Sequence, residues 1–189
     1  MASTLKVNTI QHTGGTSAVS IDSSGQVSLP NTHLHQQWQL TSNIASNDTV
    51  LSPFALSTIS SQTNAMVGPS MSHSSGIFTF PKTGLYKVTM DMMGINGGGS
   101  QDNYINVRIN LSTDSGGSYT ILKEVISGGV ASMAFGHAGS VFINVTNAST
   151  FRVQFKTASI GSGSNINGNA ANSFSYTTAT FERLTDAQS

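Results

Sequence analysis

The stretch SVFINVTNASTFRVQFKT, residues 140–157, alternates apolar and polar side chains on either side of a polar tetrapeptide. In an extended chain every second side chain points to the same face. This spacing groups Val141, Ile143 and Val145 on one face of the first half, and Phe151, Val153 and Phe155 on one face of the second. The tetrapeptide NAST is rich in turn-forming residues. The stretch therefore predicts two β-strands, each with one polar face, joined by a turn.

The same alternation recurs along the chain. YINVRINLS, residues 104–112, places Val107, Ile109 and Leu111 on one face. No window repeats apolar residues at the spacing of three and four that a helix requires, and strong turn signals such as VGPS and INGGGSQDN separate the apolar runs. We therefore expect an all-β chain of about eight strands, folded as a two-sheet sandwich or a jelly roll.

The composition limits the classes of partner. The chain has 189 residues, 37% of them hydrophobic, which suits one domain with a core and an appendage. Only 8% are charged and the net charge is zero, about a third of the usual charged fraction. A surface this neutral does not attract nucleic acid or anionic lipid. It favours association with further copies of the same chain.

Targeting and redox signals are sparse. The chain contains no cysteine, so it forms neither disulfides nor thiolate metal sites. The sequence shows no signal-peptide pattern at its start, and it lacks the run of about 18 apolar residues that spans a bilayer. We therefore expect a soluble protein that is made in a cytoplasm and has no membrane partner.

Four segments, in order, resemble the tumour-necrosis-factor and complement globular-head superfamily. They are HQQWQLTS (residues 35–42), GIFTFPKTGLYKVTM (76–90), GHAGSVFINVTNASTFRVQF (136–155) and SYTTATFERL (175–184). The resemblance implies a jelly-roll domain over residues 33–189, whose closing strand lies centrally in an inner sheet. It also implies a homotrimer in which three inner sheets meet on a three-fold axis. The interface residues expected from it are Trp38, Leu40, Tyr176 and Phe181.

The first 32 residues form a separate segment, which contains TLKVNTIQHTGG and AVSIDSSGQVSLP. These phrases resemble N-terminal segments of structural proteins from tailed phages, marine ones in particular. Their apolar clusters are too short to bury themselves, and IDSSGQ predicts a hairpin turn between two short strands. We expect residues 1–32 to be a virion-attachment arm. Its short strands would be covered in one of two ways: three arms wind together, or one arm adds a strand to a capsid or tail protein. A disordered leader is the alternative. The residues expected to attach are Leu5, Val7, Ile10, Val19, Ile21, Val27 and Leu29.

Two histidines are the candidate metal ligands. His33 and His35 are two residues apart, so in an extended chain both imidazoles project from one side. A three-fold axis would bring six of them together, and phage fibre tips with a His-x-His motif bind iron in this way, by resemblance. No carboxylate or cysteine is close in sequence, so polar linker residues are the alternative, and we expect no metal and no cofactor.

No pattern indicates catalysis. Ser and His residues are present, but none lies on a strand–turn–helix elbow, and Asp91, Asp102, Asp114 and Glu124 show no pairing. The glycine runs are not followed by the Lys-Ser or Lys-Thr of a phosphate loop. STDSGGS, residues 112–118, lacks the later glutamate of a calcium loop and predicts a turn. We therefore expect no catalytic residues and no enzymatic activity.

These observations predict a virion structural protein, made in the host cytoplasm and placed on the virion surface. A capsid decoration or short head fibre is favoured, because an arm of about 30 residues is short for a tail shaft. The alternative is a tail-fibre or receptor-binding tip that recognises a host surface glycan or protein. Aromatic faces beside amides suit sugars, and the candidate receptor contacts are Tyr104, Tyr119, Asn165 and Asn167.

Overall fold

Among the residues that the structure describes, all regular elements are β-strands. The structure is a computed structural model, and it describes residues 9–11, 17–21, 23–25, 27–28, 33–57, 66–97, 104–128, 132–161, 163–170 and 174–188. The strands, in chain order, are β1 (Thr9–Gln11), β2 (Ser17–Ile21), β3 (Val27–Ser28), β4 (Leu34–Leu40), β5 (Phe54–Leu56), β6 (Met66–Val67), β7 (Ser72–Ser74), β8 (Ile77–Thr79), β9 (Gly84–Ile95), β10 (Ile105–Ser112), β11 (Thr120–Ser127), β12 (Ala134–Val145), β13 (Arg152–Ser159), β14 (Asn165–Ile166) and β15 (Thr178–Thr185).

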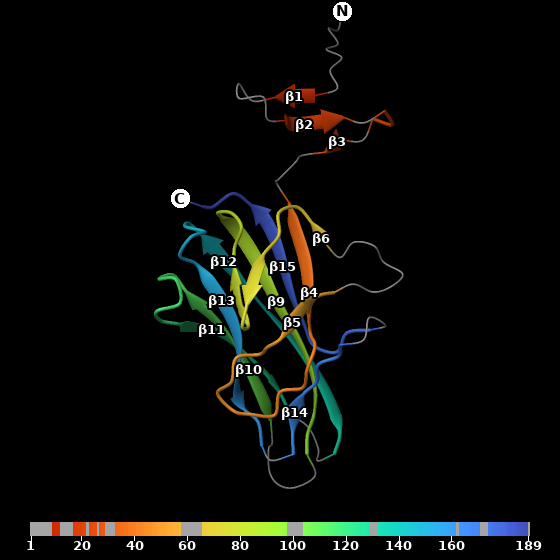
Figure 1. The fold of residues 1–189 in the computed structure, drawn as a ribbon, viewed down its shortest axis with the longest axis vertical. Helices are drawn as coiled ribbons and strands as arrows, with labels where there is room; N and C mark the ends of the chain where they lie inside the picture. Colours follow the sequence, from red (N-terminus) through yellow and green to blue (C-terminus); the bar gives the residue numbers. More distant parts are fainter. Residues whose placement is uncertain are drawn as a thin grey trace, which may run out of the picture.

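Two sheets pack face to face (Figure 1). The larger has the strand order β12-β9-β15-β4-β5, with β14 paired to β9 and β6 paired to β4. The smaller has the order β11-β10-β13-β8-β7. A third sheet, β1-β2-β3, is formed by the first 28 residues alone.

The strand pairs are nested. β10 pairs with β11, β9 with β12, β8 with β13 and β4 with β15, all antiparallel. Such nesting arises when one long hairpin folds over itself into two sheets, which is the jelly-roll arrangement. The expected all-β jelly-roll sandwich is therefore confirmed, and β15 lies between β9 and β4, centrally in its sheet as expected.

Alternating side chains build the core. Along β9 the burial alternates strictly, and Tyr86, Val88 and Met90 are fully buried. Residues 140–157 fall on β12 and β13, as predicted, and Val153 and Phe155 are fully buried. The hydrophobic effect thus selects the inward face of each strand.

Aromatic rings occupy the centre of the sandwich. Phe78 is 0% exposed, and its ring centroid lies 4.8 Å from that of Phe181, 5.3 Å from Phe54 and 5.9 Å from Phe155. These tilted and edge-on contacts are the geometries that aromatic pairs favour. Gln36 is a fully buried polar residue, and its side-chain Oε1 accepts a hydrogen bond from the Met71 amide at 3.0 Å.

The first sheet is small and lies beyond the end of the sandwich at which β4 begins (Figure 1). Its register pairs Ile10 with Val19 and Ile21 with Val27. β2 and β3 flank the IDSSGQ segment, so the predicted strand–turn–strand is confirmed. No helix in the described part of the chain is long and apolar enough to cross a bilayer.

Candidate functional site

The candidate site is the outer face of the larger sheet, meaning the side chains of β4, β15, β9 and β12 that point away from the core. The registers of these strands align the outer side chains in rows. The rows are His35, Glu182, Lys87 and Phe142; Gln37, Thr180, Thr89 and Ser140; and Gln39, Thr178, Asp91 and Ala138. Two of the three rows thus consist mainly of hydroxyl, amide and methyl groups.

The first row carries a small ion cluster. Glu182 lies 3.5 Å from Nδ1 of His35 through one carboxylate oxygen and 3.5 Å from Nζ of Lys87 through the other. All three side chains are partly exposed, so the two ion pairs contribute little to the stability of one chain. Phe142 of β12, which is aligned with Lys87 of β9, is 65% exposed. Its ring adds apolar area to this otherwise polar face.

The third row is partly covered by the segment after β14. Gln39 is only 3% exposed. Its Nε2 donates a hydrogen bond to the Asn169 carbonyl at 3.3 Å, and its Oε1 accepts one from the Ser175 hydroxyl at 2.6 Å. The amide is therefore satisfied within the chain and holds this segment on the sheet.

The residues expected at a trimer interface do not all reach the surface. Leu40 and Phe181 are 0% exposed, and the Trp38 ring lies 5.5 Å from Phe78 inside the sandwich. The expectation was wrong for Leu40 and Phe181, because the apolar side of β4 and β15 faces the core, whereas Trp38 is only half-buried. Tyr176 is 36% exposed and lies edge-on to Phe174, with ring centroids 4.9 Å apart. Of the four residues, Trp38 and Tyr176 keep part of their surface exposed in one chain.

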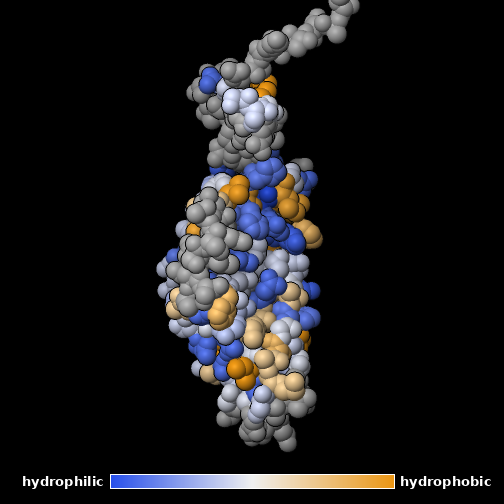
Figure 2. Space-filling model, turned by 90° about the vertical axis from the view of Figure 1, so that its right-hand side faces the viewer, coloured by the Kyte–Doolittle hydropathy of each residue, from blue (hydrophilic) through white to orange (hydrophobic). Residues whose placement is uncertain are grey.

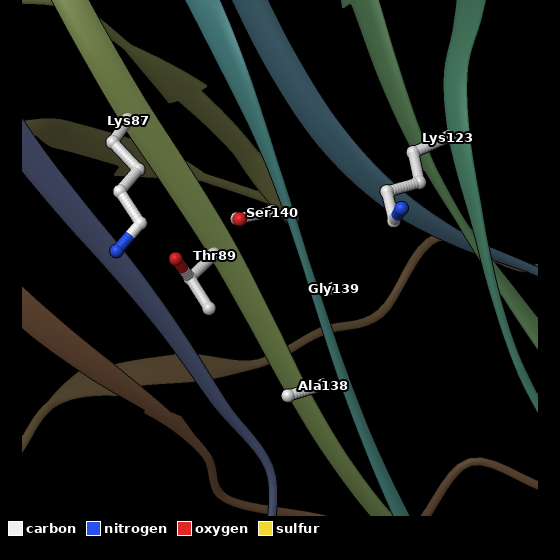
Figure 3. Close-up of a pocket in the computed structure, with 6 residues that line it drawn as sticks. All are labelled: Lys87, Thr89, Lys123, Ala138, Gly139 and Ser140. Atoms are coloured by element: carbon white, nitrogen blue, oxygen red, sulfur yellow. The ribbon is translucent and has the colours of Figure 1, made fainter.

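A shallow hollow lies where β12 forms the border of the outer face (Figure 3). It has a volume of about 310 Å³. The lining residues are Lys87 and Thr89 from β9, Lys123 from β11, and Ala138, Gly139 and Ser140 from β12. Two ammonium groups and two hydroxyls give the hollow a positive, hydrogen-bonding character, which suits an anionic group.

Gly139 shapes this hollow. A Cβ at this position would lie 2.9 Å from Cε of Lys123 and 2.7 Å from Cγ2 of Val125. Because glycine has no side chain, the aliphatic stem of Lys123 packs close to the β12 backbone. A charged side chain from the smaller sheet thereby reaches the larger one.

Sequence reasoning missed Lys123 altogether and found Asp91 without a role. The alternation in YKVTMDMM places Asp91 on the same face as Lys87 and Thr89, so this pattern was the available signal for Asp91. For Lys123 no local pattern exists, because its position depends on a contact between β11 and Gly139 of another strand.

The two candidate metal ligands are both exposed. His35 pairs with Glu182, a carboxylate that is distant in sequence. Within the described residues, no group of three or more His, Cys, Asp or Glu side chains could hold a metal ion.

The candidate receptor contacts separate into two places. Tyr104 and Tyr119 flank opposite ends of the eight-residue strand β10, which places them about 25 Å apart. The ring of Tyr119 is partly buried, and burial raises the pKa of its hydroxyl. The structure therefore does not bring these two aromatic residues together in one site.

Asn165 and Asn167 lie near the same end as Tyr104. Asn165 pairs with Ile95 at the end of β9, and Ile95 also pairs with the start of β12. The side-chain oxygens of both asparagines are buried and have no hydrogen-bond partner among the residues that the structure describes. Met133, whose backbone carbonyl accepts the Asn96 amide, is 57% exposed, and Ile95 is 40% exposed. This end of the sandwich thus combines amides with exposed apolar side chains.

The expected attachment residues fall partly on the small sheet. Leu5, Val7 and Leu29 lie outside the described residues. The register places Ile10, Val19, Ile21 and Val27 at aligned positions of β1, β2 and β3. Ile10 is 51% exposed. The apolar side of the small sheet is therefore not fully covered within one chain.

Two polar groups with shifted pKa values serve the fold. Burial lowers the pKa of His73, whose ring lies 4.7 Å from that of Phe78 and whose Nε2 accepts the Gly76 amide. Asp114 accepts hydrogen bonds from the hydroxyls of Ser112 and Ser118, which hold the pKa of its carboxyl well below its usual range. STDSGGS is therefore a side-chain-stabilised turn, as predicted.

Figure 2 shows the side of the molecule that lies on the right of Figure 1. On this side, hydrophobic side chains of the described residues form small groups separated by hydrophilic ones. The mixture agrees with the uncharged, hydroxyl-rich composition of the chain.

Comparison with known proteins finds likeness in structure but not in sequence. No family model matches the chain, and neither does any curated protein. The structure of Eiger TNF from S. frugiperda matches with a TM-score of 0.61 and 11% identity, covering 85% of this chain and 96% of that one. Murine APRIL at pH 8.0 matches with a TM-score of 0.54 and 11% identity, covering 80% and 99%. The chain therefore has a jelly roll of the tumour-necrosis-factor type.

Proposed function

We propose that this chain is a non-enzymatic structural protein of a tailed-phage virion. Three copies assemble through the outer faces of their larger sheets, and the N-terminal segment fixes the trimer to the particle. The favoured position is the capsid surface, as a decoration or short head fibre. The phage origin rests on the resemblance of residues 4–30 to N-terminal segments of phage structural proteins.

The fold supports the trimer. By resemblance, proteins with this jelly roll associate around a three-fold axis through their inner sheets. The closing strand β15 lies centrally in the larger sheet here, which is the place that the resemblance implies for the inner sheet. The outer face carries mostly hydroxyl, amide and methyl groups, which lose little on leaving water when they are hydrogen-bonded. Its exposed Phe142 and Tyr176 supply apolar area at such a contact.

The observation that carries the attachment role is the small sheet itself. Among the described residues, the hydrophobic core contains only side chains from Leu34 onward. A three-stranded sheet of this size with a half-exposed Ile10 is marginal alone and gains stability from a partner. Three arms packed together, or one arm paired with a capsid protein, provide that partner.

A receptor-binding tip is the second candidate, and one observation favours it. The end of the sandwich opposite the small sheet presents Tyr104, Met133 and Ile95, each at least 40% exposed, beside Asn165 and Asn167. Apolar and aromatic surface next to amide groups suits a glycan or a protein. In this alternative the trimer is part of the tail apparatus.

Two measurements test the proposal. Light scattering coupled to size-exclusion chromatography should give the mass of three chains, because the outer faces need partners. Gold-labelled antibody against the sandwich, applied to intact particles, should then mark the head. Labelling of the tail would favour the receptor-binding tip, and a mass of one chain at every concentration would contradict the trimer.

A further inference from the structure

Asp91 is a carboxylate for which the described residues of one chain provide no hydrogen-bond or ion-pair partner. It is half-buried on the outer face, between Ala138 and Thr178 of the neighbouring strands. In the described part of the chain the other carboxylates are bound: Asp48 to Lys156, Glu124 to Arg108, Glu182 to Lys87 and His35, Asp186 to Arg183, and Asp114 to Ser112 and Ser118. Covering an unpaired carboxylate with a neutral surface would be strongly unfavourable. A subunit that packs over Asp91 therefore needs a cation at this point.

Lys123 has the opposite charge to Asp91 and is the second residue of the argument. Its ammonium group forms no ion pair with any residue that the structure describes, and its stem reaches the hollow beside Gly139. Two lysines, Lys87 and Lys123, line the hollow. Among the described residues, only Lys87 is paired with a carboxylate, that of Glu182. The hollow therefore keeps an excess of about one positive charge.

The two charges lie at different places on the same surface. Asp91 lies on β9 within the outer face, whereas Lys123 stands at the border where β11 meets β12 (Figure 3). In a closed ring each subunit uses two different patches, one toward each neighbour. A ring of three therefore allows the border of one subunit to cover the inner part of the face of the next.

We propose that the Asp91 carboxylate of a second copy enters the hollow and pairs with Lys123. Ser140 and Thr89 line the same hollow and have hydroxyls that can donate to a carboxylate oxygen. The hollow of about 310 Å³ has room for the side chain. The inference rests on the proposed trimer and deepens it. The hollow of one subunit is completed by the carboxylate of the next, and a ring of three subunits contains three such contacts.

Charge reversal tests the pairing on the full-length protein. Asp91→Lys and Lys123→Asp each place two like charges together, so each should raise the protein concentration for half-assembly by about tenfold or more. The double variant, Asp91→Lys with Lys123→Asp, should recover most of the loss. Sedimentation equilibrium measures all three, and circular dichroism confirms that each chain is folded. Lys82→Asp, at a lysine with no ion pair among the described residues and in the turn before β9, is the matched control and should leave assembly unchanged.

The outcomes separate this inference from the trimer itself. If wild-type protein is a monomer, both fail. If it is a trimer and the two single variants assemble like wild type, the pairing is overturned and the trimer stands. If both single variants assemble more weakly and the double variant does not regain assembly, the pairing is also overturned. Should a reversal prevent folding, the neutral pair Asp91→Asn and Lys123→Gln replaces it, and a coupling of zero in the double-mutant cycle contradicts the proposal.

Discussion

At the scale of single residues, burial of aromatic rings determines most of what can be measured on one chain. Phe78 has ring neighbours from both sheets, among them Phe155 on β13 and Phe181 on β15. It therefore joins the two layers rather than only filling space within one of them. When a side chain in this position is truncated, no neighbouring side chain fills the space that it leaves.

Replacing Phe78 by alanine should lower the free energy of unfolding by about 3–5 kcal/mol, because a fully buried ring is lost and a cavity remains. Urea unfolding followed by fluorescence measures the change. Leu184→Ala, at a side chain that is 45% exposed, is the control and should cost less than about 1 kcal/mol. Equal effects of the two substitutions would contradict the proposed core.

His73 should make stability depend on pH. Burial lowers the pKa of His73 below its ordinary value of 6.5 in the folded chain. As the pH falls below 6.5, the unfolded chain takes up this proton before the folded one, so the free energy of unfolding decreases. Glutamine keeps an acceptor for the Gly76 amide but does not titrate.

Urea unfolding at pH 7.5 and at pH 5.5 covers the ordinary titration range of a histidine, which is about two pH units wide. The loss of stability between these two pH values should be smaller in His73→Gln than in wild type. His137→Gln, at an exposed histidine on β12, is the matched control. The same loss in wild type and His73→Gln would show that His73 does not carry the effect.

At the scale of elements, alternation predicted strands and shared faces correctly but did not say which face turns inward. β12 and β13 appeared where the pattern of residues 140–157 placed them. Leu40 and Phe181 were assigned to the wrong side, because both are fully buried in one chain. The inward side follows from the whole sandwich, because an apolar face is buried by the opposite sheet.

Contacts between distant strands account for the rest of what the sequence did not reveal. The ion pair of His35 with Glu182 and the packing of Lys123 over Gly139 join residues far apart in the chain. Neither has a local signal, since each depends on the register of strands from different parts of the fold.

Close packing of β14 on β9 gives a prediction at this scale. A Cβ at Gly94 would lie 2.4 Å from the Asn165 carbonyl oxygen and 2.4 Å from the Phe135 ring. Gly94→Ala should therefore displace β14, lower the free energy of unfolding by about 1–3 kcal/mol and speed amide exchange at Ile166 and Asn167.

The matched control is Gly136→Ala on the neighbouring strand, where the nearest atom to a Cβ is 3.6 Å away. Hydrogen exchange resolved by residue compares the two variants. Unchanged protection of Ile166 and Asn167 in Gly94→Ala would mean that the contact between β14 and β9 is not tight.

At the scale of the whole molecule, the chain separates a self-contained sandwich from a small sheet that contributes no described side chain to its core. Deleting residues 1–32 should therefore leave the trimer and the cooperative unfolding of the sandwich intact. Incorporation into particles should be lost, because the proposed attachment residues are removed. Light scattering measures the first result, and immunoblotting of purified particles the second. Particles that still carry the shortened protein would contradict the attachment role.

The nested strand pairing also decides where new sequence can be added. β4 and β15 are neighbours, and Gln188 is hydrogen-bonded to Asn144, so the sandwich begins and ends at one pole (Figure 1). In the proposed assembly, a protein fused to the C-terminus would be held beside the surface of the particle. A peptide grafted into the connection from β9 to β10 would instead be carried to the far pole, where antibodies and cells can reach it.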